Sequence, residues 1–105
     1  MTKIYNKLVR DKIPEIIEAS GAKCTSEILN DEDYLRMIDS KLSEELAEYH
    51  TDRNIEELAD LLEVIYAAAV ARGYSIEELE TVRAKKRMAR GGFEKKLLLV
   101  SVEED

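Results

Sequence analysis

The chain has few of the residues that mark secreted or membrane proteins. Its 105 residues include one cysteine, one proline, four glycines, one phenylalanine and no tryptophan. The lone thiol, Cys24, cannot form an internal disulfide, which is typical of a reducing compartment. No apolar run approaches the ~20 residues of a membrane-spanning helix, and the segment Met1 to Arg10 has no signal-peptide core. We therefore expect a cytoplasmic protein without a membrane segment.

The rest of the composition is ordinary for a helical protein. Hydrophobic residues make up 45% of the chain and charged residues 37%. By the usual relation between length and domain number, we expect one domain over residues 1–105. A chain of this size buries only a modest core, so association with a second copy would help it.

Acidic and basic side chains are unevenly distributed. The net charge of −7 argues against binding of a nucleic-acid polymer. Residues 13–82 hold five basic and eighteen acidic side chains, residues 1–12 hold four and one, and residues 83–96 hold seven and one. Basic ends folded over an acidic centre would suit a polyphosphate held by a metal on one side and by Lys or Arg on the other. The plainer interpretation, that the ends only neutralise an acidic body, is equally open at this point.

Capping residues and apolar spacing predict the first two helices. Asp11 is a candidate cap for the first, with Pro14 in its first turn and Gly21 directly after its end. The second is expected from about Asn30 to about His50, because apolar residues recur there at spacings of three and four. This stripe consists of Leu35, Ile38, Leu42, Leu46 and Tyr49.

Two capping-box patterns predict the remaining helices. Asn54-x-x-Glu57 should open a third helix that runs to residues 72–73, and Ser75-x-x-Glu78 a fourth that runs to about residue 90. The third is apolar almost all round from residue 58 to residue 71, so we expect it to be buried on most sides. The predicted fold is an all-α four-helix bundle. Residues 23–29 are expected to be extended or to form a brief strand, and residues 97–102 are a β-prone run that could pair with them or with a partner chain.

Two acidic pairs form the most informative pattern. Glu45 and Glu48 are three residues apart, as are Glu57 and Asp60, so each pair shares one helix face. The pairs are symmetric about a point between residues 52 and 53, and a chain reversal there would bring them together. Four carboxylates repel strongly unless a divalent cation lies among them, and oxygen ligands suit Mg²⁺ or Mn²⁺. The alternative is a pair of solvated helix faces. By helical angle Glu44 points away from this set.

Basic and aromatic residues flank the acidic centre. Lys7, Arg10 and Lys12 alternate with apolar residues near the start of the chain, and they either line a solvated helix entry or contact phosphates. Basic residues also fill the last turns of the fourth helix, where they favour its dipole. Two glycines and Phe93 follow them, and Phe93 is placed to stack on a nucleotide base. We expect His50 to be a surface or capping histidine.

The pattern Glu44-Glu45-x-x-Glu48 followed by Glu57-x-x-Asp60 resembles the MazG-like all-α nucleoside triphosphate pyrophosphohydrolase superfamily. The segment from Tyr5 to Pro14 and the Arg-Gly-Gly-Phe at residues 90–93 resemble a small branch of predicted house-cleaning pyrophosphatases. The likeness covers nearly the whole chain. Only eight residues separate Glu48 from Glu57, fewer than in most of that superfamily.

The resemblance implies a fold, a reaction and residue roles. It implies a MazG-like bundle that cleaves a nucleoside triphosphate between the α- and β-phosphates and releases a nucleoside monophosphate and pyrophosphate. Mg²⁺, or Mn²⁺, would be the cofactor, as one ion or two, and Glu48 the preferred base, slightly ahead of Glu45. The implied metal ligands are Glu45, Glu48, Glu57 and Asp60. The candidate phosphate-binding residues are Lys7, Arg10, Lys12, Lys86 and Arg90.

Several alternatives stay open at this stage. A non-catalytic helical module that binds a nucleotide or a protein would keep the same acidic face without turnover. A phosphoribosyl-ATP pyrophosphohydrolase would use the same site on another substrate. We expect a homodimer or higher homo-oligomer, because four short helices cannot cover the apolar third helix. Whether the basic residues reach the site within one subunit or from a neighbour is not determined by the sequence.

Overall fold

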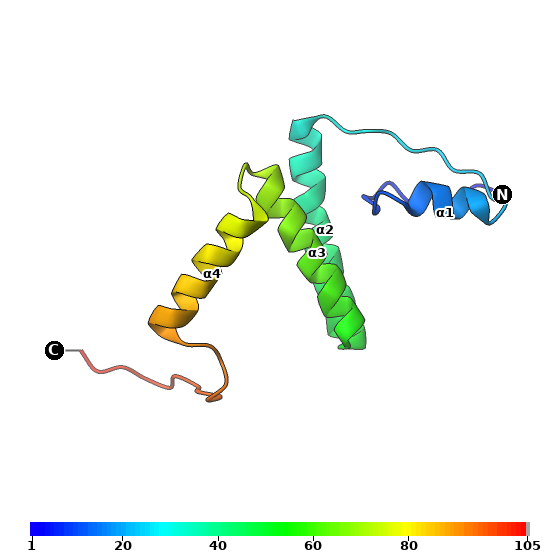
Figure 1. Ribbon diagram of the computed structural model, residues 1–105. Coiled ribbons are helices and arrows are strands. Elements are labelled where there is room, and N and C mark those ends of the chain that lie inside the picture. Colours follow the sequence, from blue (N-terminus) through cyan, green and yellow to red (C-terminus); the bar gives the residue numbers. More distant parts are fainter. Residues whose placement is uncertain (105) are drawn as a thin grey trace.

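Four α-helices make up the regular structure of the computed structural model, which describes residues 1–104. The helices are α1 (Ile13–Ala19), α2 (Asp31–Asp52), α3 (Ile55–Ala71) and α4 (Ile76–Arg90). α2 and α3 form an antiparallel pair, α4 diverges from the end of α3, and α1 lies apart on the other side (Figure 1). The predicted all-α, four-helix fold is confirmed.

Side-chain caps begin the three longer helices where the sequence predicts. Asn30 accepts a hydrogen bond from the backbone N–H of Asp33 at 2.8 Å, and Asn54 accepts one from Glu57 at 2.9 Å. Ser75 forms the complete capping box with Glu78. Each cap satisfies a backbone N–H that has no partner within its helix. The acidic residues in each first turn add a favourable interaction with the positive end of the helix dipole.

The reversal between α2 and α3 uses only two residues. Arg53 adopts a left-handed conformation with φ 51°, and its N–H donates to the carbonyl of Tyr49, which closes the end of α2. Asn54 then begins α3. So short a connection forces the two helices to run back along each other, as the symmetric spacing of the acidic pairs predicted.

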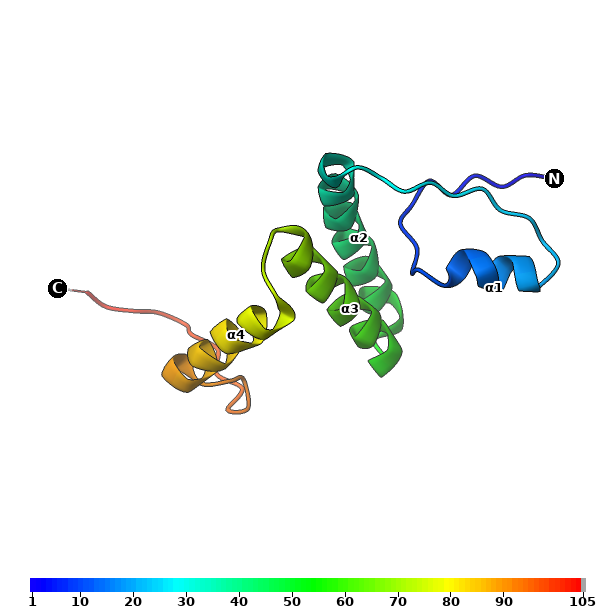
Figure 2. The same ribbon diagram turned by 45° about the horizontal axis from the view of Figure 1, so that its top comes forward.

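The structure corrects the predicted cap of α1 and shows no strand in either of the two candidate segments. Lys12, not Asp11, is the N-cap residue of α1, and it makes no capping hydrogen bond, because the helix begins two residues after Asp11. Residues 23–29 and 97–102 form no strand within the described part of the chain. Strands need a paired neighbour to satisfy their backbone groups, and here the connection from α1 to α2 and the C-terminal extension lie on opposite sides of the α2–α3 pair (Figure 2).

The packing of α3 also differs from the prediction. No residue of α3 is buried, although Ala67, Ala68 and Ala69 are half-buried. Its large side chains Leu58, Leu62, Ile65 and Val70 are 37–55% exposed. The only buried apolar side chain in residues 1–104 is Ile38 of α2. α3 meets α2 along one face and α4 near its end, so its remaining apolar surface has no helix covering it within residues 1–104.

The molecule is less compact than is usual for a chain of its length. Its radius of gyration is 18.6 Å, with extents of 65 × 31 × 24 Å, whereas a compact domain of about 100 residues has roughly 13 Å. None of the helices in residues 1–104 combines the length and apolarity that a membrane span requires.

Candidate metal centre

Carboxylates of α2 and α3 converge on the facing side of the helix pair. Oxygens of Glu45, Glu57 and Asp60 all lie within 4.8 Å of one another. A second group, Glu44, Glu45 and Glu48, meets the same criterion along α2. Glu45 belongs to both groups, so it is the centre of the cluster. The predicted meeting of the two acidic pairs is therefore observed for Glu45 and Asp60, while Glu48 lies on the α2 side.

Burial makes this cluster different from a solvated helix face. Glu45 is only 6% exposed. Its Oε2 and the Oε2 of Glu57 are buried and have no hydrogen-bond partner. A buried carboxylate oxygen without a partner is costly, and the cost is removed when a cation binds both oxygens. The set of donors therefore fits a hard divalent cation such as Mg²⁺ or Mn²⁺, which prefers oxygen ligands.

The electrostatics of Glu57 also indicate excess negative charge. Burial raises the pKa of its carboxyl above the ordinary value of 4.5, and the nearby charges of Glu48 and Asp52 raise it further. Carboxylates this close disfavour each other's ionised form. A cation placed among them would have the opposite effect and lower that pKa.

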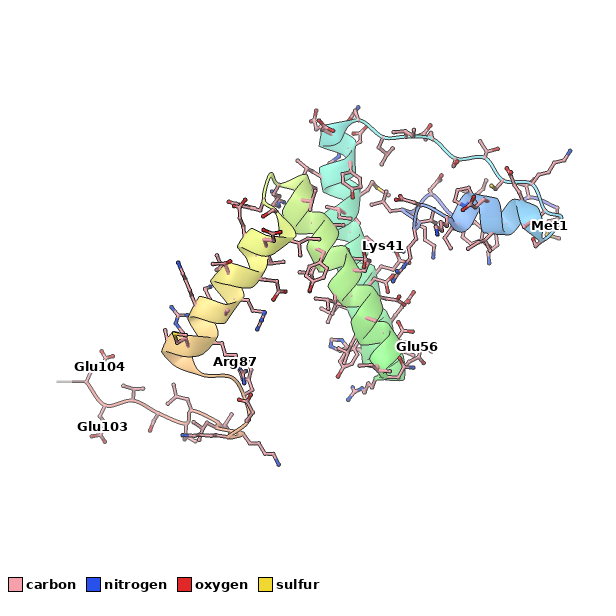
Figure 3. The ribbon with its side chains drawn as sticks, viewed as in Figure 1. Met1, Lys41, Glu56, Arg87, Glu103 and Glu104 are labelled. Atoms are coloured by element: carbon pink, nitrogen blue, oxygen red, sulfur yellow. The ribbon has the colours of Figure 1, made fainter. Side chains whose placement is uncertain are left out.

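Lys41 is a member of the site that the sequence analysis missed. Its Nζ lies 3.3 Å from Glu44 Oε2 and 3.4 Å from Glu45 Oε1, and its side chain is only 17% exposed. Figure 3 shows it midway along α2. The sequence could have predicted these two contacts, because Glu44 and Glu45 follow Lys41 by three and four residues, and residues at those spacings are neighbours on a helix. Lys41 partly neutralises Glu44 and Glu45 but leaves the second oxygen of Glu45 unpaired.

Glu44 lies closer to the cluster than its helical angle suggested. Its carboxylate bridges Lys41 and Lys7, with the Lys7 Nζ at 3.1 Å from Oε1. Burial alone would raise the pKa of Glu44, but the hydrogen bonds from these two lysines outweigh it and hold the pKa below the ordinary value. The prediction that Glu44 points away was wrong toward Glu45 and Glu48 on its own helix, although Glu44 does stay outside the group that includes Glu57 and Asp60.

The N-terminal segment brings two of the predicted basic residues to the carboxylates. Lys7 pairs with Glu44, which raises the pKa of Lys7. Arg10 Nη2 lies 2.6 Å from Asp60 Oδ1. The two contacts reach across 37 and 50 residues of sequence. These two ion pairs link the N-terminal segment, which precedes α1, to both α2 and α3.

The other predicted phosphate-binding residues lie elsewhere in this chain. Lys12 is exposed at the start of α1. Lys86 and Arg90 are exposed on α4, and the Phe93 side chain is 97% exposed just beyond it. The end of α4, marked by Arg87 in Figure 3, projects away from the N-terminal segment in both orientations. A role for these residues at the cluster stays a prediction, and it would require a neighbouring subunit.

Two further features, His50 and an open hollow, lie along α2 and α3. His50 is exposed near the end of α2, and its backbone carbonyl accepts a hydrogen bond from Arg53. An open hollow of about 310 Å³ lies further along α3 toward α4, with Glu63 and Tyr66 in its wall. Tyr66 donates a hydrogen bond to Glu80 and so ties α3 to α4 at this hollow.

The fold and site define an all-helical protein with a carboxylate cluster between two antiparallel helices. A protein from Mycolicibacterium smegmatis (strain ATCC 700084 / mc(2)155), described as uncharacterized, is 50% identical to this chain over 42 residues. The match covers 40% of this chain and 43% of that protein. No family model matches the chain, and no solved structure matches it.

Proposed function

We propose that the chain is a Mg²⁺-dependent nucleoside triphosphate pyrophosphohydrolase. It cleaves its substrate between the α- and β-phosphates and releases a nucleoside monophosphate and pyrophosphate. A role in removing noncanonical nucleotides in the cytoplasm agrees with this activity, and Mn²⁺ is an alternative cofactor. The sequence likeness to MazG-like pyrophosphohydrolases motivates the choice of reaction.

One observation carries the proposal. Two buried carboxylate oxygens, on Glu45 and Glu57, have no hydrogen-bond partner among the described residues. Asp60 lies within 4.8 Å of both residues' ligand atoms, and basic side chains lie at the edge. A solvated helix face would have no reason to bury unpaired carboxylates.

Different residues of the chain would bind the cation, bind the phosphates and accept the proton. Glu45, Glu57 and Asp60 would hold the metal, with Glu48 beside them. When bound, Mg²⁺ supplies positive charge that stabilises the phosphoryl oxygens. Lys7 and Arg10, which already reach this edge, would hold the outer phosphates as charge-assisted hydrogen-bond donors.

Glu48 is the group best placed to accept a proton from the attacking water. It is exposed, so water reaches it, and it lies next to Glu45 in the cluster. The attack forms the bond from the water oxygen to the α-phosphorus and breaks the bond to the oxygen that bridges to the β-phosphorus. The proton passes from the water to the carboxylate of Glu48.

We also propose that the active form is a homodimer or a higher homo-oligomer. The exposed apolar side chains of α3 and the open shape of the chain support this. An assembly would cover α3 and would offer a route for Lys86, Arg90 and Phe93 to reach a neighbour's cluster. Size-exclusion chromatography with light scattering tests it, and only monomer at micromolar concentration would contradict it.

The reaction is tested with Mg²⁺ and a panel of canonical and modified nucleoside triphosphates, phosphoribosyl-ATP included. We expect pyrophosphate release from at least one of them, and a drop of about 10³-fold, equivalent to about 4 kcal/mol, in Asp60→Ala. Glu56→Gln is the matched control, because Glu56 is an exposed acid of the same helix outside the cluster. Tight nucleotide binding without product would instead favour a binding module.

A further inference from the structure

Arg10 and a bound cation would use the same oxygen-bearing group. Arg10 Nη2 donates to Asp60 Oδ1 at 2.6 Å, and Asp60 is one of the three residues whose oxygens converge between the helices. This inference rests on the metal site proposed above. A guanidinium and a divalent cation beside one carboxylate repel each other, so each weakens the binding of the other.

The contact between Arg10 and Asp60 is suited to exchange. Both side chains are largely open to solvent, at 58% for Arg10 and 42% for Asp60. Exposed pairs of this kind contribute little to stability, so they break easily. The segment that carries Arg10 has no helical structure before Ile13, and α1 does not pack on another helix within residues 1–104. Moving Arg10 therefore disrupts no packed element.

We propose that Arg10 is an exchangeable counter-ion of the carboxylate cluster. It holds Asp60 when no divalent cation is bound, and it leaves Asp60 when a cation binds. The released guanidinium then lies at the same edge of the site, where it can donate two hydrogen bonds to one phosphate group in a bidentate contact. The N-terminal segment thus couples loading of the metal to presentation of an anion-binding arginine.

Lys7 behaves differently because its partner is different. Glu44 belongs to the α2 group and not to the group that spans both helices. It is also held by Lys41 at 3.3 Å. In the absence of substrate, Lys7 should therefore stay on Glu44 when a cation binds, and it keeps the segment near the site while Arg10 moves.

Mn²⁺ binding, followed by electron paramagnetic resonance or calorimetry, tests the competition without any substrate. We expect Arg10→Ala to bind Mn²⁺ about two- to five-fold more tightly than the unmodified chain, the range that an exposed ion pair represents. Lys12→Ala is the matched control, because it removes the same charge from the same segment without touching the cluster. Its affinity should change much less.

Limited trypsin digestion gives a second readout that does not depend on affinity. Trypsin must take the arginine side chain into its own pocket, so release from Asp60 should expose the bond after Arg10. We expect Mn²⁺ to speed cleavage after Arg10 several-fold relative to cleavage after Lys12. In Asp60→Asn the cleavage after Arg10 should be fast with or without Mn²⁺.

The outcomes separate this inference from the proposed function. If Mn²⁺ binds but Arg10→Ala and Lys12→Ala have equal affinities and the cleavage ratio does not change, the exchange is wrong and the metal site stands. If the unmodified chain binds no Mn²⁺ at millimolar concentration, the metal site itself is wrong and the exchange falls with it.

Discussion

The α2–α3 pair and the region from α4 to the C-terminal extension differ in how their structure is supported. α2 contains both side chains that are buried in residues 1–104, Ile38 and Glu45, and ion pairs from the N-terminal segment reach α2 and α3. In α4 every residue from 81 to 90 is exposed, and beyond it Leu97, Leu98, Leu99 and Val100 are 80–87% exposed. Yet α4 has the most complete cap of all the helices. Local signals therefore define where a helix lies in the sequence, whereas tertiary contacts define where it lies in space.

The largest effect on stability should come from the centre of the α2–α3 pair. Ile38 is 4% exposed and is the only buried apolar side chain of the described chain. Ile38→Ala should lower the free energy of unfolding by about 2–4 kcal/mol, because it removes buried methyl groups and leaves a cavity. Urea denaturation followed by circular dichroism measures it.

Ile28 provides the matched control for that prediction. It is fully exposed in the segment before α2, so Ile28→Ala should change stability by no more than about 0.5 kcal/mol. Equal effects of the two substitutions would mean that the α2–α3 pair is not the stable part of the molecule.

Replacing Glu57 in the carboxylate cluster should change stability less than Ile38→Ala does, and it should stabilise the protein at neutral pH. Because the pKa of Glu57 is raised in the folded state, the native protein binds more protons there than the unfolded chain between pH 4.5 and the raised value. The contribution of Glu57 to stability therefore falls as pH rises through this window, and it is least favourable at neutral pH. Glu57→Gln should raise Tm at pH 7 and lose this advantage below about pH 4.5.

Thermal unfolding over pH 4–8 checks this prediction, and Mg²⁺ sharpens it. Saturating Mg²⁺ should stabilise the unmodified chain and not Glu57→Gln, since only the former keeps the full set of ligands. Glu56→Gln should follow the unmodified chain throughout. A lower Tm of Glu57→Gln at neutral pH would show that the carboxylate is satisfied without a cation.

The sequence predicted most of what depends on neighbouring residues along the chain. Asn30, Asn54 and Ser75 begin helices as expected, and Gly91, with φ 84°, follows the end of α4. The short reversal at Arg53 was also predicted from the symmetric spacing of the acidic pairs. These features succeed because caps and left-handed residues satisfy backbone groups locally.

The features that failed depend on partners that are distant in sequence. The apolar run at residues 97–102 favours a strand, but no neighbouring strand is present to pair with it within residues 1–104. α3 is apolar on most sides, but in the described part of the chain α2 and α4 are the only helices that cover it. At the site, the contact of Glu44 with Lys7 was missed because the two residues are 37 positions apart in the sequence. Lys41 lies one turn from Glu44 on the same helix, and could have been found from that spacing alone.

The smallest effect should come from α4, and it separates local from tertiary support. Ser75→Ala removes the side chain that accepts from the Glu78 N–H at 3.0 Å, at a cost of about 1 kcal/mol. Because α4 packs only against the end of α3, the loss should appear as faster amide hydrogen exchange within α4, with exchange in α2 unchanged. Ser101→Ala, in the exposed C-terminal extension, should change neither. If Ser75→Ala speeds exchange in α2 equally, then α4 supports the α2–α3 pair, and the two regions unfold as one unit.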